Sequence, residues 1–238
     1  MKKFTYIFSL IFITTLLFIT FNPTVVQSQD TDVTVEDLRN LVRNNIVPNA
    51  RATQTIGSPY FFENYREGYV TLFDGNVTEP LMMNYNVYEN QIEFVDGSNI
   101  LAINAERMGG FTFTSNENEL EFKKGFKADG LDANEFVQVL SDGPVTALLK
   151  HDISFLENVP TYGSATQVDE YTTDEQLYIH KEEEGKTERI RRVRERNILR
   201  AIDSHQDQME QYVEENRLDL RSYNDIKRFF DYYNSLSQ

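Results

Sequence analysis

The residues best suited to proton transfer or metal binding are three histidines, and their spacing argues against both roles. His151, His180 and His205 are far apart in the sequence, and none belongs to a His-x-x-x-His or His-Glu-x-x-His pair that would place two imidazoles on one helix face for zinc. His151 and Asp152 could form half of a catalytic triad, but no Gly-x-Ser-x-Gly motif supplies the nucleophile. We therefore predict surface histidines or hydrogen-bonded core histidines, and no metal site.

A second group of polar side chains, between Asp129 and Glu135, brings several oxygen ligands together. Asp129, Asp132, Asn134 and Glu135 are of the type that hard cations such as calcium prefer, but their spacing does not match a twelve-residue calcium loop. We interpret the segment as a polar loop. A pair of carboxylates for glycoside hydrolysis cannot be selected from sequence among 38 acidic residues, because their separation depends on the fold.

The most distinctive charge feature is a switch from acidic to basic residues at the start of the C-terminal region. Glu182 to Glu184 are followed, between Lys186 and Arg200, by seven basic and two acidic residues, a local net charge of +5. If a helix begins near Thr187, its apolar face holds Ile190 and Val193 and its opposite face is a cationic stripe. The stripe consists of Arg189, Arg192, Arg196 and Arg200.

Such a stripe could bind carboxylates or phosphates, on an acidic envelope protein or on anionic lipid head groups. The alternative is a solvated face that the rest of this acidic molecule neutralises, with exposed pairs such as Glu188 and Arg192 contributing only a few tenths of a kcal/mol each.

The first 28 residues match a secretory signal peptide. Lys2 and Lys3 precede an apolar run from Ile7 to Phe21, and Val26-Gln27-Ser28 matches the cleavage pattern, so we expect residues 1–28 to be removed. The mature chain then has 21 basic and 38 acidic residues, a net charge of −17, which argues against nucleic acid as a partner. We expect an exported protein, periplasmic or outer-membrane-associated or extracellular, with no transmembrane segment in its mature form.

Cysteine is absent, which excludes disulfides, thiolate metal sites and an acylated cysteine anchor. The 17 phenylalanines and 13 tyrosines concentrate in short segments with Val, Ile and Thr, a composition that favours strands.

The elements that would position these residues fall into three regions of the mature chain. Residues 29–59 hold a short helix, with a capping box at Thr34 and Asp37, followed by a linker. Residues 60–185 form an antiparallel β domain of about ten strands, among them separate strands at 166–172 and 176–180, divided by turn signals such as Asp74-Gly75. Residues 186–238 form a helical region that packs on the β domain as a bundle of three short helices, starting near Thr187, Ser204 and Ser222. The prediction is an α+β protein with an antiparallel β-sandwich or half-open barrel.

Four short motifs resemble a family of uncharacterised exported proteins of Bacteroidota. They are Gly57-Ser58-Pro59-Tyr60, Asn84-Tyr85-Asn86-Val87-Tyr88, Leu148-Leu149-Lys150 and Tyr232-Tyr233-Asn234. The resemblance implies a Gram-negative envelope setting and contributes no catalytic residue.

Three functional hypotheses follow from the sequence. The first is a non-catalytic extracytoplasmic interaction or accessory module, without a cofactor, whose helical tail or cationic stripe docks on an envelope partner. The second is a lipocalin-like carrier of an apolar or lipidic ligand, if the aromatic side chains line a cavity instead of filling a core. The third is a carboxylate-based hydrolase.

Overall fold

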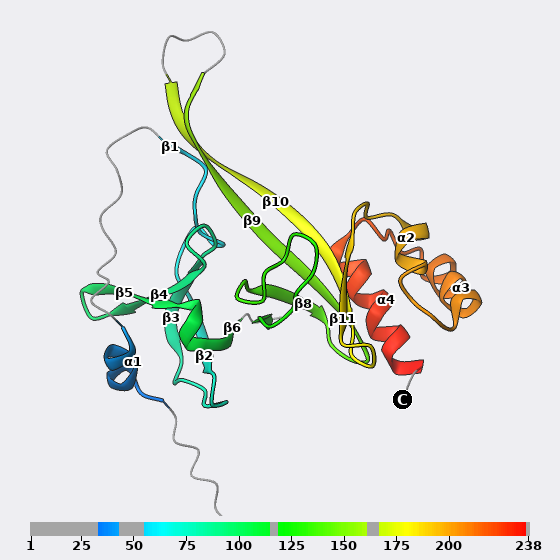
Figure 1. Ribbon diagram of the computed structural model, residues 1–238, viewed down its shortest axis with the longest axis horizontal. Coiled ribbons are helices and arrows are strands. Elements are labelled where there is room, and N and C mark those ends of the chain that lie inside the picture. The colour runs from blue at the N-terminus through cyan, green and yellow to red at the C-terminus, as the bar shows by residue number, and fades with distance from the viewer. Residues whose placement is uncertain (1–32, 43–54, 115–118, 161–166, 237–238) are drawn as a thin grey trace, which may run out of the picture. The chain divides into compact units, whose positions relative to one another are not determined.

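The computed structural model describes residues 33–42, 55–114, 119–160 and 167–236, so the expected signal peptide lies outside the described residues. The described chain is an α+β structure in which one large mixed β-sheet is followed by helices (Figure 1). The strands of the first half are β1 (Thr55–Ile56), β2 (Arg66–Leu72), β3 (Leu81–Asn86), β4 (Gln91–Asp96), β5 (Asn99–Asn104) and β6 (Met108–Phe113). Those of the second half are β7 (Leu120–Lys123), β8 (Val137–Ser141), β9 (Val145–Pro160), β10 (Gln167–Lys181) and β11 (Lys186–Ile190).

The α-helices lie at both ends of the described chain, and a short 3-10 turn lies between β5 and β6. They are α1 (Val35–Leu41), the 3-10 turn η1 (Ala105–Arg107), α2 (Glu195–Leu199), α3 (Gln206–Asn216) and α4 (Tyr223–Leu236). The predicted capping box is confirmed at α1, where Thr34 Oγ1 accepts from the Asp37 N–H and the Asp37 carboxylate accepts from the Thr34 N–H.

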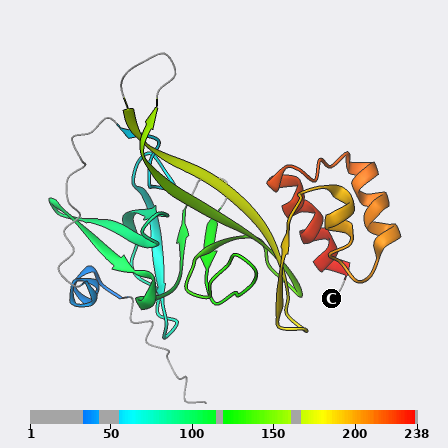
Figure 2. The same cartoon turned by 45° about the horizontal axis from the view of Figure 1, so that its top comes forward.

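The strand order is β1-β10-β9-β8-β7-β6-β2-β3-β4-β5, with β11 also paired to β10, and the sheet does not close. Its pairs are antiparallel except for the short parallel pair of β1 and β10. β9 and β10 make a long twisted ribbon that reaches beyond the other strands at one end (Figures 1 and 2).

Two predicted boundaries are wrong, for related reasons. The two short strands expected at 166–172 and 176–180 belong to one strand, β10, because polar Thr173, Asp174 and Glu175 continue the ladder opposite β9. The helix expected from Thr187 does not form, because Gly185, at φ 58°, closes a tight turn that returns residues 186–190 along the edge of β10. Helix begins only at Glu195, and the helical stripe of Arg189, Arg192, Arg196 and Arg200 therefore does not exist.

The main core lies in two clusters. The first gathers buried side chains from α1, β2 to β7 and β9, including Tyr85, Phe111 and Phe122. The second joins the base of the ribbon to the three C-terminal helices, with Leu149 and Leu177 packed in the same cluster as Phe229 and Phe230.

Asn234 fixes α4 to the sheet beside the second cluster. Its side chain accepts from the Val145 N–H (3.1 Å) and donates to the Val145 carbonyl (2.9 Å). Gly143 comes so close that a Cβ atom there would lie 2.7 Å from the Asn234 side chain, so this contact requires glycine.

Candidate functional site

The loop of residues 124–136, between β7 and β8, covers one face of the ribbon near its base. Its ends are joined by a hydrogen bond from the Gly125 N–H to the Ala133 carbonyl (2.9 Å), and Ala128 and Leu131 exchange backbone hydrogen bonds at 3.1 Å. Leu131 is buried against Leu148 and Tyr178 of the two ribbon strands. A small apolar cluster therefore holds a loop that otherwise consists largely of polar residues.

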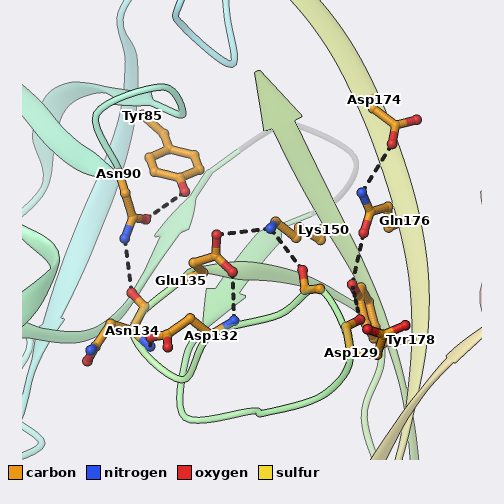
Figure 3. Close-up of polar contacts among 11 residues, drawn as sticks. Tyr85, Asn90, Asp129, Asp132, Asn134, Glu135, Lys150, Asp174, Gln176 and Tyr178 are labelled. Carbon is orange, nitrogen blue, oxygen red and sulfur yellow. Dashed lines mark hydrogen bonds and ion pairs between the residues drawn. The ribbon is translucent and has the colours of Figure 1, made fainter. Parts of the chain in front are cut away.

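Lys150 of β9 points into this loop (Figure 3). Its ammonium donates to Glu135 Oε1 (2.9 Å) and to the Gly130 carbonyl (3.1 Å), and its side chain is only 9% exposed. The second carboxylate oxygen of Glu135 accepts from the Asp132 N–H at 2.7 Å. Because the ammonium is buried and has a charged partner, Lys150 is suited to fixing the loop and not to nucleophilic chemistry, which needs a free amine.

A line of polar contacts runs from the loop along the same face of β10 (Figure 3). The Tyr178 hydroxyl lies 3.2 Å from the Asp129 carbonyl and 2.9 Å from Gln176 Oε1, and the Gln176 amide donates to Asp174 (3.1 Å). Burial raises the pKa of the Tyr178 hydroxyl, while the nearby Arg189 opposes that shift. The line joins the base of the ribbon to its protruding part.

The loop is also tied to the turn between β3 and β4. The Asn90 side chain donates to the Asn134 carbonyl (3.0 Å) and accepts from the Tyr85 hydroxyl (2.9 Å). The polar-loop interpretation of residues 129–135 agrees with these contacts. Within the described residues, no group of three or more histidine or carboxylate side chains is placed to hold a metal ion.

The predicted partner-binding arginines lie beside this loop, on different elements. Arg189 is on β11, Arg192 is in the turn that follows, Arg196 is in α2, and Arg200 caps the end of α2. We call residues 189–200 the arginine segment. Arg191 forms an ion pair with Asp129 of the loop (3.2 Å), which joins the segment to the loop.

The other arginines of the segment have no carboxylate partner in the described part of the chain. Arg192, Arg194, Arg196 and Arg200 are exposed and Arg189 is half-buried, and none forms an ion pair with a described residue. The sequence left open that the molecule's own carboxylates neutralise these arginines. Among the described residues, such an ion pair is seen for Arg191 alone.

His151 lies between the two core clusters. Its ring packs edge-on against Phe61, with Nε2 2.9 Å from Gln138 Oε1 and Nδ1 3.2 Å from Glu175 Oε1. His180 lies beside Thr187, on the opposite face of the ribbon, so the structure does not bring these two histidines together. His151 is satisfied within the structure, as predicted.

Burial lowers the pKa of His151, and the facing Glu175 only partly offsets this. The ordinary pKa of histidine is 6.5, and below this pH the folded state therefore binds fewer protons at His151 than the unfolded chain does. We predict that the His151 contribution to stability is present above about pH 6.5 and is lost as the pH falls towards the lowered pKa. Urea unfolding at about pH 5.5 and 7.5 measures this, and His151→Gln should reduce the difference between the two pH values. An unchanged difference in the variant would contradict the prediction.

A buried carboxylate, Glu93 of β4, is not among the candidate residues predicted from the sequence. It is fully buried and accepts hydrogen bonds from the hydroxyls of Tyr60 (3.0 Å) and Tyr65 (3.1 Å) and from the amides of Asn86 (3.0 Å) and Gln91 (3.4 Å). Burial, reinforced by the Glu93 charge, raises the pKa of both tyrosines. No cation among the described residues pairs with Glu93, so four neutral donors satisfy it.

Glu93 also explains why two of the sequence motifs lie together. Tyr60 and Asn86, one from each motif, both donate to Glu93 and form an antiparallel bridge at the end of β3. Beside this bridge, the Val87 N–H donates to the Pro59 carbonyl (2.9 Å) and the Phe61 N–H to the Tyr85 carbonyl (2.9 Å). The available signal was a single glutamate between Ile92 and Phe94 in an apolar strand.

No known family model, curated protein or solved structure matches this chain. In the described residues, no helix is long and apolar enough to cross a membrane.

Proposed function

We propose that this protein is a non-catalytic, extracytoplasmic interaction module that docks an acidic protein partner on its arginine segment. The observation that carries the proposal is the set of five arginines between 189 and 200 that form no ion pair with a described residue. The chain has a net charge of −15, so carboxylates are plentiful, yet Asp129 alone among the described ones pairs with this segment.

The chemistry of arginine favours a partner rich in carboxylates. A guanidinium is planar, permanently charged and able to donate two parallel hydrogen bonds to one carboxylate. Each exposed pair contributes little by itself, but several in one surface speed association and set the orientation of the complex.

The placement of the arginines favours a protein partner over a lipid surface. A helix that lies on a membrane presents a cationic face and a continuous apolar face. Here the arginines are distributed over a strand, a turn and the five-residue α2, whose Ile198 and Leu199 are buried against the molecule. No apolar helix face accompanies these charges.

The compartment is part of the proposal. The predicted signal peptide and the resemblance to exported envelope proteins support the periplasm or the outer-membrane surface, where partner proteins are accessible to an exported chain.

We also infer that the sheet curls into a half-open barrel filled by side chains. Tyr85 of β3 packs on Phe122 of β7 (5.7 Å between ring centroids) and on Phe136 beside β8 (6.0 Å), although β6 and β2 separate β3 from β7 in the strand order. Phe111 packs on Phe122 at 4.6 Å. These aromatic rings fill the concave side of the curled sheet, the space that an apolar ligand would occupy. This favours the interaction module over a carrier of an apolar ligand.

Crosslinking in the producing cell tests the function. The wild type is compared with a chain that carries Arg189→Gln, Arg192→Gln, Arg196→Gln and Arg200→Gln, and the crosslinked products are fractionated and identified by mass spectrometry. We expect an acidic envelope protein whose recovery falls at least about tenfold in the variant, equivalent to about 1.4 kcal/mol.

A matched control changes four exposed basic residues elsewhere to glutamine, namely Arg66, Arg107, Arg217 and Lys227. It should leave recovery unchanged. Equal recovery in wild type and variant, or the same loss in the control, would refute the docking role of the arginine segment.

A further inference from the structure

The ribbon of β9 and β10 has a protruding part whose charge is opposite to that of the arginine segment. We call residues 150–160 of β9 and 167–176 of β10 the arm. β8 pairs only with residues 147–149 and β11 only with residues 177–181, and the arm's strand neighbour is the two-residue β1, which pairs with Asp169 and Glu170. Between residues 151 and 180 the chain has six carboxylates and no lysine or arginine. The arginine segment begins beside the base of the same ribbon, where Arg189 and Ile190 of β11 pair with Tyr178 and Leu177 of β10, and it continues off the ribbon through the turn into α2.

The arm contains an uncompensated pair of like charges. Asp152 and Asp174 are direct partners in the ladder, so their side chains project from the same face of the ribbon. Like charges directly opposite each other destabilise a strand pair. The lysine on the same face, Lys150, is bound to Glu135 and Gly130, and neither aspartate forms an ion pair with a described residue. An arginine from outside the arm would relieve this repulsion.

The arm does not use the arginines of its own chain in this way. Asp174 is four residues from Tyr178, which pairs with Arg189 of β11, a separation of about 13 Å along an extended strand, and Glu170 is eight residues, or about 26 Å, from the same pair. The ladder of β9 and β10 runs through this interval and keeps the strand extended. In the described part of the chain, no carboxylate of the arm pairs with an arginine.

We propose that the partner of the arginine segment is a second copy of this chain, in a two-fold symmetric dimer in which each arm lies on the arginine segment of the other copy. The inference rests on the proposed function and names the acidic partner. Because the arginine segment begins at the base of the ribbon, where the acidic arm ends, an antiparallel alignment of two copies can bring each arm to the arginine segment of the other copy, as a two-fold interface requires. Leu156, an apolar side chain on the arm that is 47% exposed, provides apolar area beside the charges.

The large net negative charge of each copy does not prevent this contact at physiological ionic strength. Charges separated by more than about 8 Å are largely screened there, whereas arginine and carboxylate groups in contact are screened less. The complex should therefore weaken when the salt concentration is raised well above the physiological value.

Sedimentation equilibrium of the protein purified from the producing cell tests the proposal, over about 1 to 100 µM. Two charge-reversed variants are used. One has Asp152→Lys, Glu170→Lys and Asp174→Lys in the arm, and the other has Arg192→Glu, Arg196→Glu and Arg200→Glu in the arginine segment. We expect a dimer for the wild type and at least about hundredfold weaker self-association for each variant, since like charges then face each other in both contacts.

Mixing the two variants is the decisive measurement. In a mixed pair, lysines of one arm face glutamates of the other copy, and the native arm faces native arginines, so a heterodimer should form with close to wild-type affinity. A control with Glu63→Lys, Glu67→Lys and Glu106→Lys, exposed carboxylates outside the arm, should still dimerise.

A wild-type monomer over the whole range, or a mixture that stays monomeric, would overturn the dimer. If the arginine-to-glutamine chain nevertheless lost a different acidic protein in the crosslinking experiment, the proposed function would stand without this inference. If neither self-association nor crosslinking depended on the arginines, both would fall.

Discussion

Replacing Glu93 by alanine is expected to lower the free energy of unfolding by about 3 to 5 kcal/mol. The substitution removes the acceptor shared by four donors and leaves a cavity at a position with no exposed surface. Asn86 is itself buried, so its amide would have no access to bulk water as a substitute partner. Urea unfolding followed by far-ultraviolet circular dichroism measures the change.

Smaller substitutions in the same network separate two contributions to the loss of stability, the lost hydrogen-bond acceptor and the lost side-chain volume. Glu93→Gln keeps the size but turns an amide NH₂ group towards donors, so we expect a cost of about 1 to 3 kcal/mol. Tyr60→Phe and Tyr65→Phe each remove one donor and should cost about 1 kcal/mol. A Glu93→Gln protein as stable as the wild type would show that the hydrogen bonds to Glu93 are unimportant to stability, and any loss in the alanine variant would then reflect the cavity alone.

The parts of the fold that sequence predicts well are those determined by neighbouring residues. The capping box at Thr34 and Asp37 specifies the start of α1 through side-chain contacts three residues apart. The apolar spacing of Ile226, Phe229, Phe230 and Tyr233 predicts α4, and all four side chains are buried.

The parts that sequence predicts poorly depend on a distant partner. Residues 186–190 have apolar spacing compatible with a helix, but the edge of β10 is available to them once Gly185 makes the turn. Hydrogen bonds to that edge determine the structure of residues 186–190, and the sequence pattern within the segment does not predict those hydrogen bonds. The arginine stripe was wrong for this reason, since it depended on a single helix.

The polar sites follow the same distinction. The aspartates, asparagine and glutamate of residues 129–135 form a group in the sequence, but the cations that pair with them are distant: Lys150 of β9 with Glu135, and Arg191 with Asp129. A single lysine or glutamate in an apolar run, such as Glu93, indicates a buried polar network. The sequence does not identify the other residues of that network. The partners come from strands that only the fold brings together.

Phe229→Ala is expected to lower the free energy of unfolding by about 3 to 5 kcal/mol, because the ring is fully buried in the second core cluster. That cluster joins the C-terminal helices to β8, β9 and β10, whereas Phe111 belongs to the first cluster, which β9 also reaches through Ile153. Since the two clusters share the continuous β9 and β10 ribbon, we expect them to unfold together. Phe229→Ala and Phe111→Ala should each lower the midpoint of one cooperative transition.

Hydrogen exchange distinguishes this outcome from separate unfolding of the two clusters. In a cooperative molecule, Phe229→Ala reduces amide protection equally in β3 and β4 of the first cluster and in α4 of the second. If the helices instead unfolded on their own, protection would fall in α2 to α4 and in the base of the ribbon, while β3 and β4 kept wild-type rates. The second result would mean that the arginine segment lies on a region that can open independently of the sheet, and its docking would then be coupled to the local stability of that region.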